Sequence, residues 1–276
     1  MMPHNASIPE DFDAVSALYD HAMPENNVVH DIIYPRVFGP EEYIGQFSDN
    51  SASELRTLAS MLALGPDAQV LDIGCGTCAI ASFFAREKEW KITGIDVAAT
   101  SLAKARRRLM DGNPGKQISV IHGNVYTHDF EQLFEGIYGI GAFCHFEATH
   151  LFSRCRALLS PGGKLGFLER VRTDVLTPNE WKQLTEEWAC PSVYTIEEYE
   201  TALIAARFEV QNVLDLTATF RLWQERSVTV RHELREEIIA ATSERYWEIS
   251  TGLADRENQA TKQGKLGYAL VVARTL

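Results

Sequence analysis

The sequence has few basic residues for its length, and this scarcity limits the partners that the protein can bind. It contains 26 Lys and Arg against 38 Asp and Glu, which gives a formal net charge of −12. Proteins that bind nucleic-acid backbones need clustered positive charge. The one locally basic stretch, KARRRL at residues 104–109, is typical of the solvated face of a helix. We therefore expect no nucleic-acid partner.

Long apolar runs and a disulfide framework are also missing. No run approaches the ~20 apolar residues that cross a bilayer, and the start, MMPHNASIPEDFD, lacks the basic and apolar regions of a signal peptide. Five cysteines in 276 residues do not indicate a disulfide scaffold. We expect a cytoplasmic protein, a monomer or homodimer, with no membrane partner.

Alternating strands and helices follow residue 68. Apolar strands separated by helices of ten or more residues are typical of a parallel sheet built from βαβ units. Ligands of such sheets bind beyond the carboxyl ends of the strands. The first five strands are expected within AQVLDIG (68–74), WKITGIDV (90–97), QISVIHGN (117–124), GIYGIGAF (136–143) and GGKLGFLER (162–170).

The end of the chain departs from this alternation. A sixth strand near 208–215 and a last strand, LGYALVVART (266–275), flank a long helical stretch at 220–263. We predict a Rossmann-like seven-stranded sheet, parallel with an antiparallel C-terminal hairpin and flanked by helices. Residues 1–50 would form a helical N-terminal lid, and residues 51–276 the main domain, with 220–263 as a substrate cap.

The turn after the first strand fits a nucleotide-binding loop. Gly74-x-Gly76-x-x-Ala79 satisfies the glycine pattern of dinucleotide folds, and Asp96 follows about 20 residues later at the end of the next strand. A glycine pattern alone is weak evidence. The expected closing hairpin is absent from a plain dinucleotide fold and argues against that interpretation.

Two further features of VLDIGCGTC (70–78) separate the alternatives. Cys75 and Cys78 form a C-x-x-C, as in redox proteins and zinc sites, but no second C-x-x-C complements them, so we expect no metal. Asp72 lies near the end of an apolar strand, where an unpaired carboxylate is costly. It would repel a pyrophosphate and attract an ammonium group.

S-adenosylmethionine carries an α-amino acid, a ribose and an adenine without any phosphate, and the sequence resembles class I S-adenosylmethionine-dependent methyltransferases. VLDIGCGTC is similar to their first motif, and GIDV (94–97) to the segment with their ribose-binding acid. LLSPGGKLGFLE (158–169) resembles the turn and strand that follow the cofactor site. The resemblance covers about residues 50–275.

This resemblance implies a role for each matching residue. Gly74 and Gly76 would let the backbone approach the methionine portion of S-adenosylmethionine or its product, S-adenosylhomocysteine. Asp96 would accept hydrogen bonds from both ribose hydroxyls. Asn124, in HGNVYT (122–127), would accept from the adenine amino group. The full candidate set is Tyr43, Asp72, Gly74, Cys75, Gly76, Asp96, Val97, Asn124 and Val125.

A closer resemblance is to the phosphoethanolamine and sarcosine/dimethylglycine methyltransferase group. It rests on YPRVFGPEEYIGQF (34–47), AFCHF (142–146), TIEEYETALIAARF (195–208) and GKLGYALVVA (264–273). In that group the N-terminal segment folds over the cofactor, and a histidine after the fourth strand pairs with an N-terminal tyrosine. His145 matches this histidine and is the candidate general base.

The partner tyrosine is less well defined by the resemblance. The matching position is Asn26, and the nearby tyrosines are Tyr19, Tyr34 and Tyr43. Because Tyr34 and Tyr43 fall in the matching lid segment, we assign Tyr34 to catalysis with His145, and Tyr43 to cofactor binding.

Departures from the group bear on the substrate. Gly141 replaces an acidic amine ligand, and Ala189 and Pro191 replace phosphate ligands, so phosphoethanolamine is not the expected substrate. An aromatic set predicts a small apolar or aromatic metabolite methylated on N, O or C: Phe143, Phe146, Trp188, Phe220 and Trp223. Three alternatives stay open: an enzyme that rearranges the cofactor itself, an NAD-dependent oxidoreductase, and a non-catalytic cofactor-binding protein.

Overall fold

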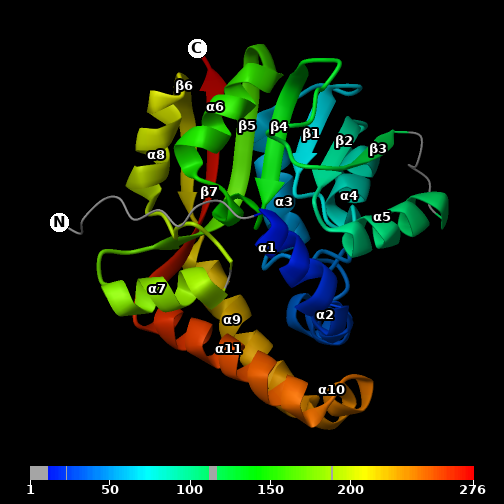
Figure 1. The fold of residues 1–276 in the computed structure, drawn as a ribbon, viewed down its shortest axis with the longest axis vertical. Helices are drawn as coiled ribbons and strands as arrows, with labels where there is room; N and C mark the ends of the chain where they lie inside the picture. Colours follow the sequence, from blue (N-terminus) through cyan, green and yellow to red (C-terminus); the bar gives the residue numbers. More distant parts are fainter. Residues whose placement is uncertain (1–11, 23, 112–116, 188) are drawn as a thin grey trace.

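Within the described residues, seven strands form one sheet in the order β3-β2-β1-β4-β5-β7-β6 (Figure 1). The computed structural model describes residues 12–22, 24–111, 117–187 and 189–276. The first five strands run parallel, and β7 pairs antiparallel with both β5 and β6, as predicted. The strands are β1 Gln69–Ile73, β2 Lys91–Asp96, β3 Ile118–His122, β4 Phe134–Ile140, β5 Leu159–Arg172, β6 Phe208–Asp215 and β7 Leu266–Thr275.

Helices cover both faces of the sheet (Figure 1). The helices α3, α4 and α5 pack on one face, and α6 and α8 on the other. Strands buried on both faces read as continuous apolar runs, which is why β1 and β7 were recognisable in the sequence. The helices are α3 Ala52–Leu62, α4 Ala79–Lys88, α5 Ala99–Asp111, α6 Ala148–Leu158, α7 Pro178–Glu187 and α8 Ile196–Ala205.

Glycines in β4 allow neighbouring side chains to pack directly against its backbone. A Cβ at Gly139 would lie 2.0 Å from the Phe143 ring, and one at Gly136 would lie 2.4 Å from Leu64. Larger residues would displace these side chains from the core. The glycine-rich fourth strand, which looked weak from propensity, is therefore required by packing.

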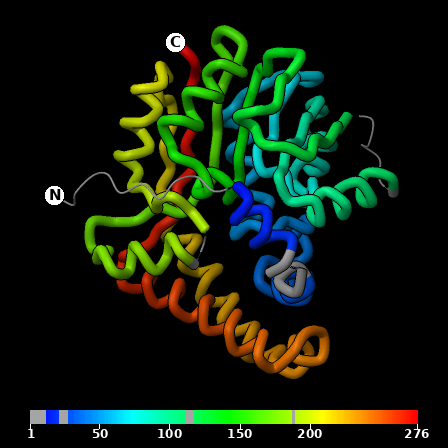
Figure 2. The backbone as a smooth tube through the Cα atoms, viewed as in Figure 1, coloured from blue at the N-terminus to red at the C-terminus, as the bar shows by residue number. Residues whose placement is uncertain are grey.

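The helical stretch between β6 and β7 forms an arm beyond the carboxyl ends of the parallel strands (Figures 1 and 2). It consists of α9 Thr217–Glu233, α10 Arg235–Ala241 and α11 Glu244–Lys262. At the N-terminus, α1 Phe12–Ala17, a π-helix at Leu18–Ala22 and α2 Pro24–Phe38 cover the same end of the sheet. Apolar side chains of α2 pack against α9, so these two segments meet over the strand ends.

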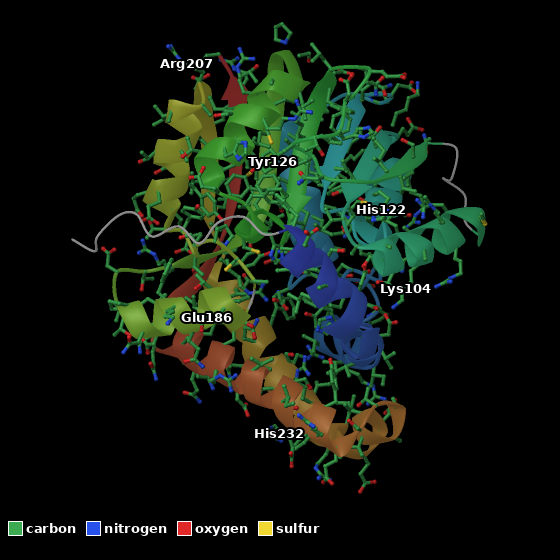
Figure 3. The ribbon with its side chains drawn as sticks, viewed as in Figure 1. Lys104, His122, Tyr126, Glu186, Arg207 and His232 are labelled. Atoms are coloured by element: carbon green, nitrogen blue, oxygen red, sulfur yellow. The ribbon has the colours of Figure 1, made fainter. Side chains whose placement is uncertain are left out.

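Exposed basic residues occupy one face of α5. Arg106 and Arg107 are exposed, and Lys104 lies at the outer side of the helix (Figure 3). This agrees with the expectation that 104–109 is a solvated face. No helix in the described ranges combines the length and apolar character that a membrane crossing needs.

Candidate functional site

A cavity of about 460 Å³ lies where the carboxyl ends of the parallel strands meet the N-terminal helices and the arm. Pockets for small ligands commonly have volumes of roughly 300–1,000 Å³. The loops after β1, β2, β3 and β4 form its base, while α1, α2, α9 and α11 contribute the opposite wall. The cavity is thus at the position that a parallel sheet predicts for a ligand.

The glycine loop lies at the base of the cavity. Gly74 and Gly76 both have positive φ, 75° and 50°. A Cβ at Gly74 would lie 2.6 Å from that of Ala142, whereas nothing lies within 4 Å of the Cβ position at Gly76. Gly76 therefore leaves space for a ligand to approach the backbone.

Asp96 holds this loop to the end of β2. Its Oδ2 accepts a hydrogen bond of 2.7 Å from Gly76 N, and its Oδ1 accepts one of 2.8 Å from Ala98 N. Burial raises the pKa of Asp96, and the hydrogen bonds from these two amides oppose that rise. Asp96 and the adjacent Val97 line the cavity, so the carboxylate is placed for a ribose contact.

The loop after β3 contributes two of the predicted cofactor-binding residues to the cavity wall. Asn124 and Val125 both line the cavity. The side-chain Oδ1 of Asn124 accepts a 2.9 Å bond from Tyr126 N. A carbonyl oxygen has two lone pairs, so this oxygen retains one for a ligand amino group.

Asp72 does not contribute to the cavity wall. Its side chain is 3% exposed, and its Oδ2 accepts a 2.9 Å hydrogen bond from the hydroxyl of Tyr138, its cross-strand neighbour on β4. Burial raises the pKa of Asp72 to about 8. In this structure Asp72 bonds to Tyr138 and does not line the cavity, so its predicted attraction of an ammonium group stays a prediction.

The raised pKa of Asp72 predicts a pH dependence that an amide would remove. Between the ordinary pKa of 3.8 and about 8, the folded protein binds a proton that the unfolded chain has released, so stability falls as pH rises. Asp72→Asn should have little effect on stability near pH 4 and stabilise the cofactor-free protein increasingly towards pH 8. Thermal melts of both proteins across this range would measure the difference; a constant difference would contradict the assignment.

Cys75 and Cys78 do not form a reactive thiol pair. Both are free and buried, and a hydrogen bond with Cys78, together with burial, raises the pKa of Cys75 well above its ordinary value. Reactive cysteines have lowered pKa values. In the described ranges, no group of three or more His, Cys, Asp or Glu residues could hold a metal ion. Cys75 lines the cavity and Cys78 fills the core beneath it.

His145 is paired with Tyr19 rather than with Tyr34. The Tyr19 hydroxyl lies 3.0 Å from His145 Nε2, and His145 Nδ1 lies 3.1 Å from the carbonyl oxygen of Ala189. Because a carbonyl only accepts, Nδ1 carries the proton, and neutral Nε2 accepts from the phenol. Burial lowers the pKa of His145 and raises that of Tyr19, which favours this neutral pair.

The two tyrosines favoured from the sequence lie elsewhere. The Tyr34 hydroxyl donates a 2.7 Å bond to Asp49, and that of Tyr43 donates a 3.0 Å bond to Asp31. Tyr34 lines the cavity away from His145, and Tyr43 does not line it. The assignments of Tyr34 to the histidine and Tyr43 to the cofactor are therefore wrong in this geometry. Asn26, the matching position, has a side chain outside the described residues.

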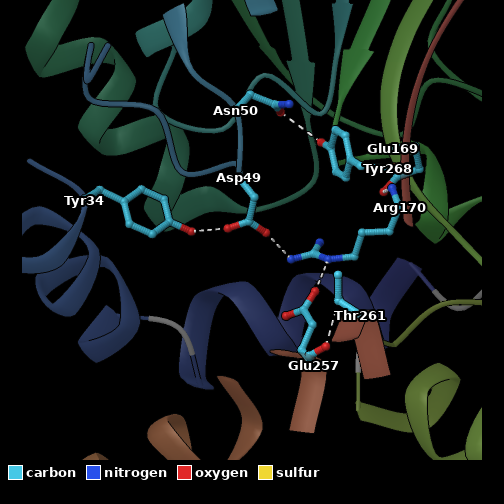
Figure 4. Close-up of polar contacts among 8 residues, drawn as sticks. All are labelled: Tyr34, Asp49, Asn50, Glu169, Arg170, Glu257, Thr261 and Tyr268. Atoms are coloured by element: carbon cyan, nitrogen blue, oxygen red, sulfur yellow. Dashed lines mark hydrogen bonds and ion pairs between the residues drawn. The ribbon is translucent and has the colours of Figure 1, made fainter. Parts of the chain in front are cut away.

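A partly buried ion cluster joins the sheet, the N-terminal segment and the arm (Figure 4). Arg170, at the end of β5, pairs with Asp49 and, at 2.5 Å, with Glu257 of α11. Asp49 Oδ1 also accepts a hydrogen bond from the Tyr34 hydroxyl. The sequence did not predict this cluster, although Glu169 and Arg170 form a charged pair near the end of the apolar strand β5.

The predicted aromatic pocket is mostly wrong. Phe146 lines the cavity, but Phe143 and Phe220 are buried in the core, and Trp223 packs on Phe38 with centroids 4.9 Å apart. The side chain of Trp188 lies outside the described residues. Other side chains give the cavity its apolar character, including Phe12, Val15, Leu18, Phe47, Ile249 and Leu253.

The residues present fit S-adenosylmethionine. The open backbone at Gly76, the carboxylate of Asp96 and the free lone pair on Asn124 face one cavity. They follow in the order that an amino-acid portion, a ribose and an adenine require. The hydroxyl–imidazole pair of Tyr19 and His145 lines the same cavity.

Comparisons with known proteins agree with this arrangement. Residues 70–163 match the family model for a methyltransferase domain. The chain is 28% identical over 58% of its length to methyltransferase phqN of Penicillium fellutanum, spanning about half (52%) of that relative. It is 26% identical over 82% of its length to the phosphoethanolamine N-methyltransferase of Plasmodium falciparum, covering 85% of that protein.

Solved structures share the fold. A phosphoethanolamine N-methyltransferase of Haemonchus contortus, in complex with S-adenosylhomocysteine, aligns with a TM-score of 0.80 and 17% identity, covering 94% of this chain and 59% of that one. The cyclopropane synthase MmaA2 of Mycobacterium tuberculosis aligns with a TM-score of 0.81 and 18% identity, covering 98% and 100%. The [4+2]-cyclase SpnF aligns with a TM-score of 0.76 and 22% identity, covering 98% and 99%.

These likenesses confirm the resemblance predicted from the sequence. Residues 70–163 match a methyltransferase domain, and the chain shares the fold of these solved structures.

Proposed function

We propose that this protein transfers the methyl group of S-adenosylmethionine to an N, O or C atom of a small molecule. The observation that carries the proposal is a single cavity. Gly76 and Asp96 line it, and so do Tyr19 and His145. The glycine loop and Asp96 suit the cofactor, and the phenol–imidazole pair suits proton transfer. Residues up to 50 would act as a lid and residues 220–263 as a cap, excluding water.

When bound, S-adenosylmethionine would supply a sulfonium-activated methyl group to a nucleophilic N, O or C atom of the acceptor. The chain aligns the acceptor and accepts its proton. The Tyr19 oxygen receives the acceptor proton as the original phenol proton moves to His145 Nε2. The bond from Nδ1 to Ala189 O holds the ring and stabilises the resulting imidazolium. Because Tyr19 occupies Nε2, His145 acts as the base through this hydroxyl.

Two measurements test the proposal. Calorimetry should detect S-adenosylhomocysteine binding, and incubation with methyl-labelled S-adenosylmethionine and a panel of small amines, phenols, acids and enols should label at least one acceptor. Boiled enzyme and a mixture without acceptors are the controls. Failure to bind S-adenosylhomocysteine would reject the cofactor site.

A second candidate is an enzyme of this fold that does not donate the methyl group. It is favoured by the absence of an acidic amine ligand at Gly141, and SpnF is a protein of similar fold named as a cyclase. Mass spectrometry of S-adenosylmethionine incubated with the enzyme alone separates the candidates. A cofactor-derived product that forms without any acceptor would favour this second candidate over methyl transfer.

A further inference from the structure

One face of each long arm helix lines the cavity. On α9 this face consists of Gln224, Ser227 and Arg231, spaced by three and four residues as helix geometry requires. On α11 it contains Ile249 and Leu253, which are 54% and 37% exposed at the cavity rim. The wall opposite the cofactor loops is therefore polar along α9 and apolar at the rim on α11.

Arg231 is a buried cation with unused hydrogen-bond donors. Its side chain is 5% exposed, whereas the next residue, His232, lies on the exposed face of α9 (Figure 3). Its Nε and Nη1 have no hydrogen-bond partner among the described residues. Burial lowers the pKa of Arg231. Burying a cation whose donors are not all satisfied costs free energy, and a ligand oxygen that accepts from these donors would recover part of that cost.

The acidic neighbours of Arg231 are already engaged. Asp49 and Glu257 both pair with Arg170 (Figure 4). Two further polar atoms in the cavity wall, His30 Nδ1 and Ser48 Oγ, also have no partner among the described residues. The cap side of the cavity thus offers a guanidinium and two small polar groups to an acceptor oxygen.

Arg231 and the proposed proton-transfer pair come from different elements of the cavity wall. Arg231 lies on α9, which packs against α2, the helix that carries His30. Burial and then the charges of Arg231 and Arg170 lower the pKa of His30. Tyr19 lies in the π-helix at Leu18–Ala22, and His145 follows β4.

We propose that Arg231 binds the carboxylate of the methyl acceptor, an organic acid with an apolar body that reacts at its other end. The inference rests on the proposed function and specifies its substrate class. Four charged side chains line this part of the cavity: Arg170, Arg231, Asp49 and Glu257. Their formal charges sum to zero. A carboxylate therefore adds half the unbalanced charge of a phosphate dianion. The apolar rim on α11 suits the hydrocarbon body.

Calorimetry on enzyme saturated with S-adenosylhomocysteine tests this with three matched probes: 3-phenylpropanoate, its neutral amide, and 2-phenylethyl phosphate. We expect the acid to bind about tenfold or more tightly than the amide. Arg231→Met should weaken acid binding by about 10- to 100-fold and leave amide binding unchanged. Arg231→Lys should recover part of the loss, and Arg226→Met, on the exposed side of α9, should match the wild type.

Thermal melts of the ligand-free proteins establish that each variant is folded. Arg231→Met leaves Arg170 alone to balance Asp49 and Glu257, so its melting temperature has to lie above the temperature of the calorimetry before affinities are compared. Equal binding of acid and amide by the wild type, or tighter Arg231-dependent binding of the phosphate, would overturn the carboxylate assignment. S-adenosylhomocysteine binding is measured first in every variant, so failure of the cofactor site is distinguished from failure of this inference.

Discussion

Replacing Asp96 by alanine is expected to weaken S-adenosylhomocysteine binding by at least about 100-fold, since two hydrogen bonds to a charged acceptor contribute about 1.5 kcal/mol or more each. In the proposed site the carboxylate accepts both ribose hydroxyls. The carboxylate also accepts a hydrogen bond from the Gly76 amide, so its removal would free the glycine loop that is proposed to contact the methionine portion. Both effects act in the same direction.

Calorimetry on Asp96→Ala, Asp96→Asn and Asp129→Ala would measure this effect. The asparagine variant keeps one acceptor oxygen and should lose affinity to an intermediate degree. Asp129 is an exposed aspartate in the loop after β3, and its replacement should leave affinity unchanged. If Asp96→Ala retained binding within about threefold, a difference below 1 kcal/mol, the ribose contact would have to be assigned elsewhere.

Removing either member of the Tyr19–His145 pair should lower kcat for methyl transfer by about 10²- to 10⁴-fold, the usual contribution of a positioned acid or base. Tyr19→Phe removes only the hydroxyl that bonds to Nε2. His145→Ala removes the proton acceptor. Because both act on one proton, the double variant should be no slower than the slower single variant.

The assay uses the acceptor found in the labelling panel, with Tyr43→Phe as the matched control because that hydroxyl bonds to Asp31 outside the cavity. The reaction requires neutral His145, and burial lowers its pKa, so activity should persist below the ordinary histidine pKa of 6.5 and fall only at lower pH. Full activity in Tyr19→Phe, or multiplicative losses in the double variant, would contradict a proton relay.

Local patterns were sufficient to predict the sheet. The apolar run of β7 and the alternation of strands and helices indicate a sheet that is buried on both faces. Both patterns can be recognised from residues that are neighbours in the sequence. The same holds for the glycine loop and Asp96, because a strand end, a turn and the next strand end are adjacent in every βαβ unit. These residues line the cavity in the structure, and their contacts with a cofactor stay a prediction.

Contacts between distant segments could not be predicted in the same way. Tyr19 and His145 are separated by 126 residues, and the choice of Tyr19 over Tyr34 depends on how the N-terminal helices cross the strand ends. The hydrogen bond of Tyr138 to Asp72 likewise depends on the register of β1 and β4, which places the two residues side by side.

The sequence by itself determined the sheet, the glycine loop and the position of Asp96 at the end of β2, because each depends on short-range periodicity and adjacent strand ends. Only the tertiary structure decided which tyrosine bonds to His145. It also decided that Asp49 and Glu257 pair with Arg170, while two donor atoms of Arg231 have no hydrogen-bond partner among the described residues. The physical reason is that hydrogen bonds and ion pairs of buried groups depend on the packing of the N-terminal helices and the arm, which no local pattern encodes.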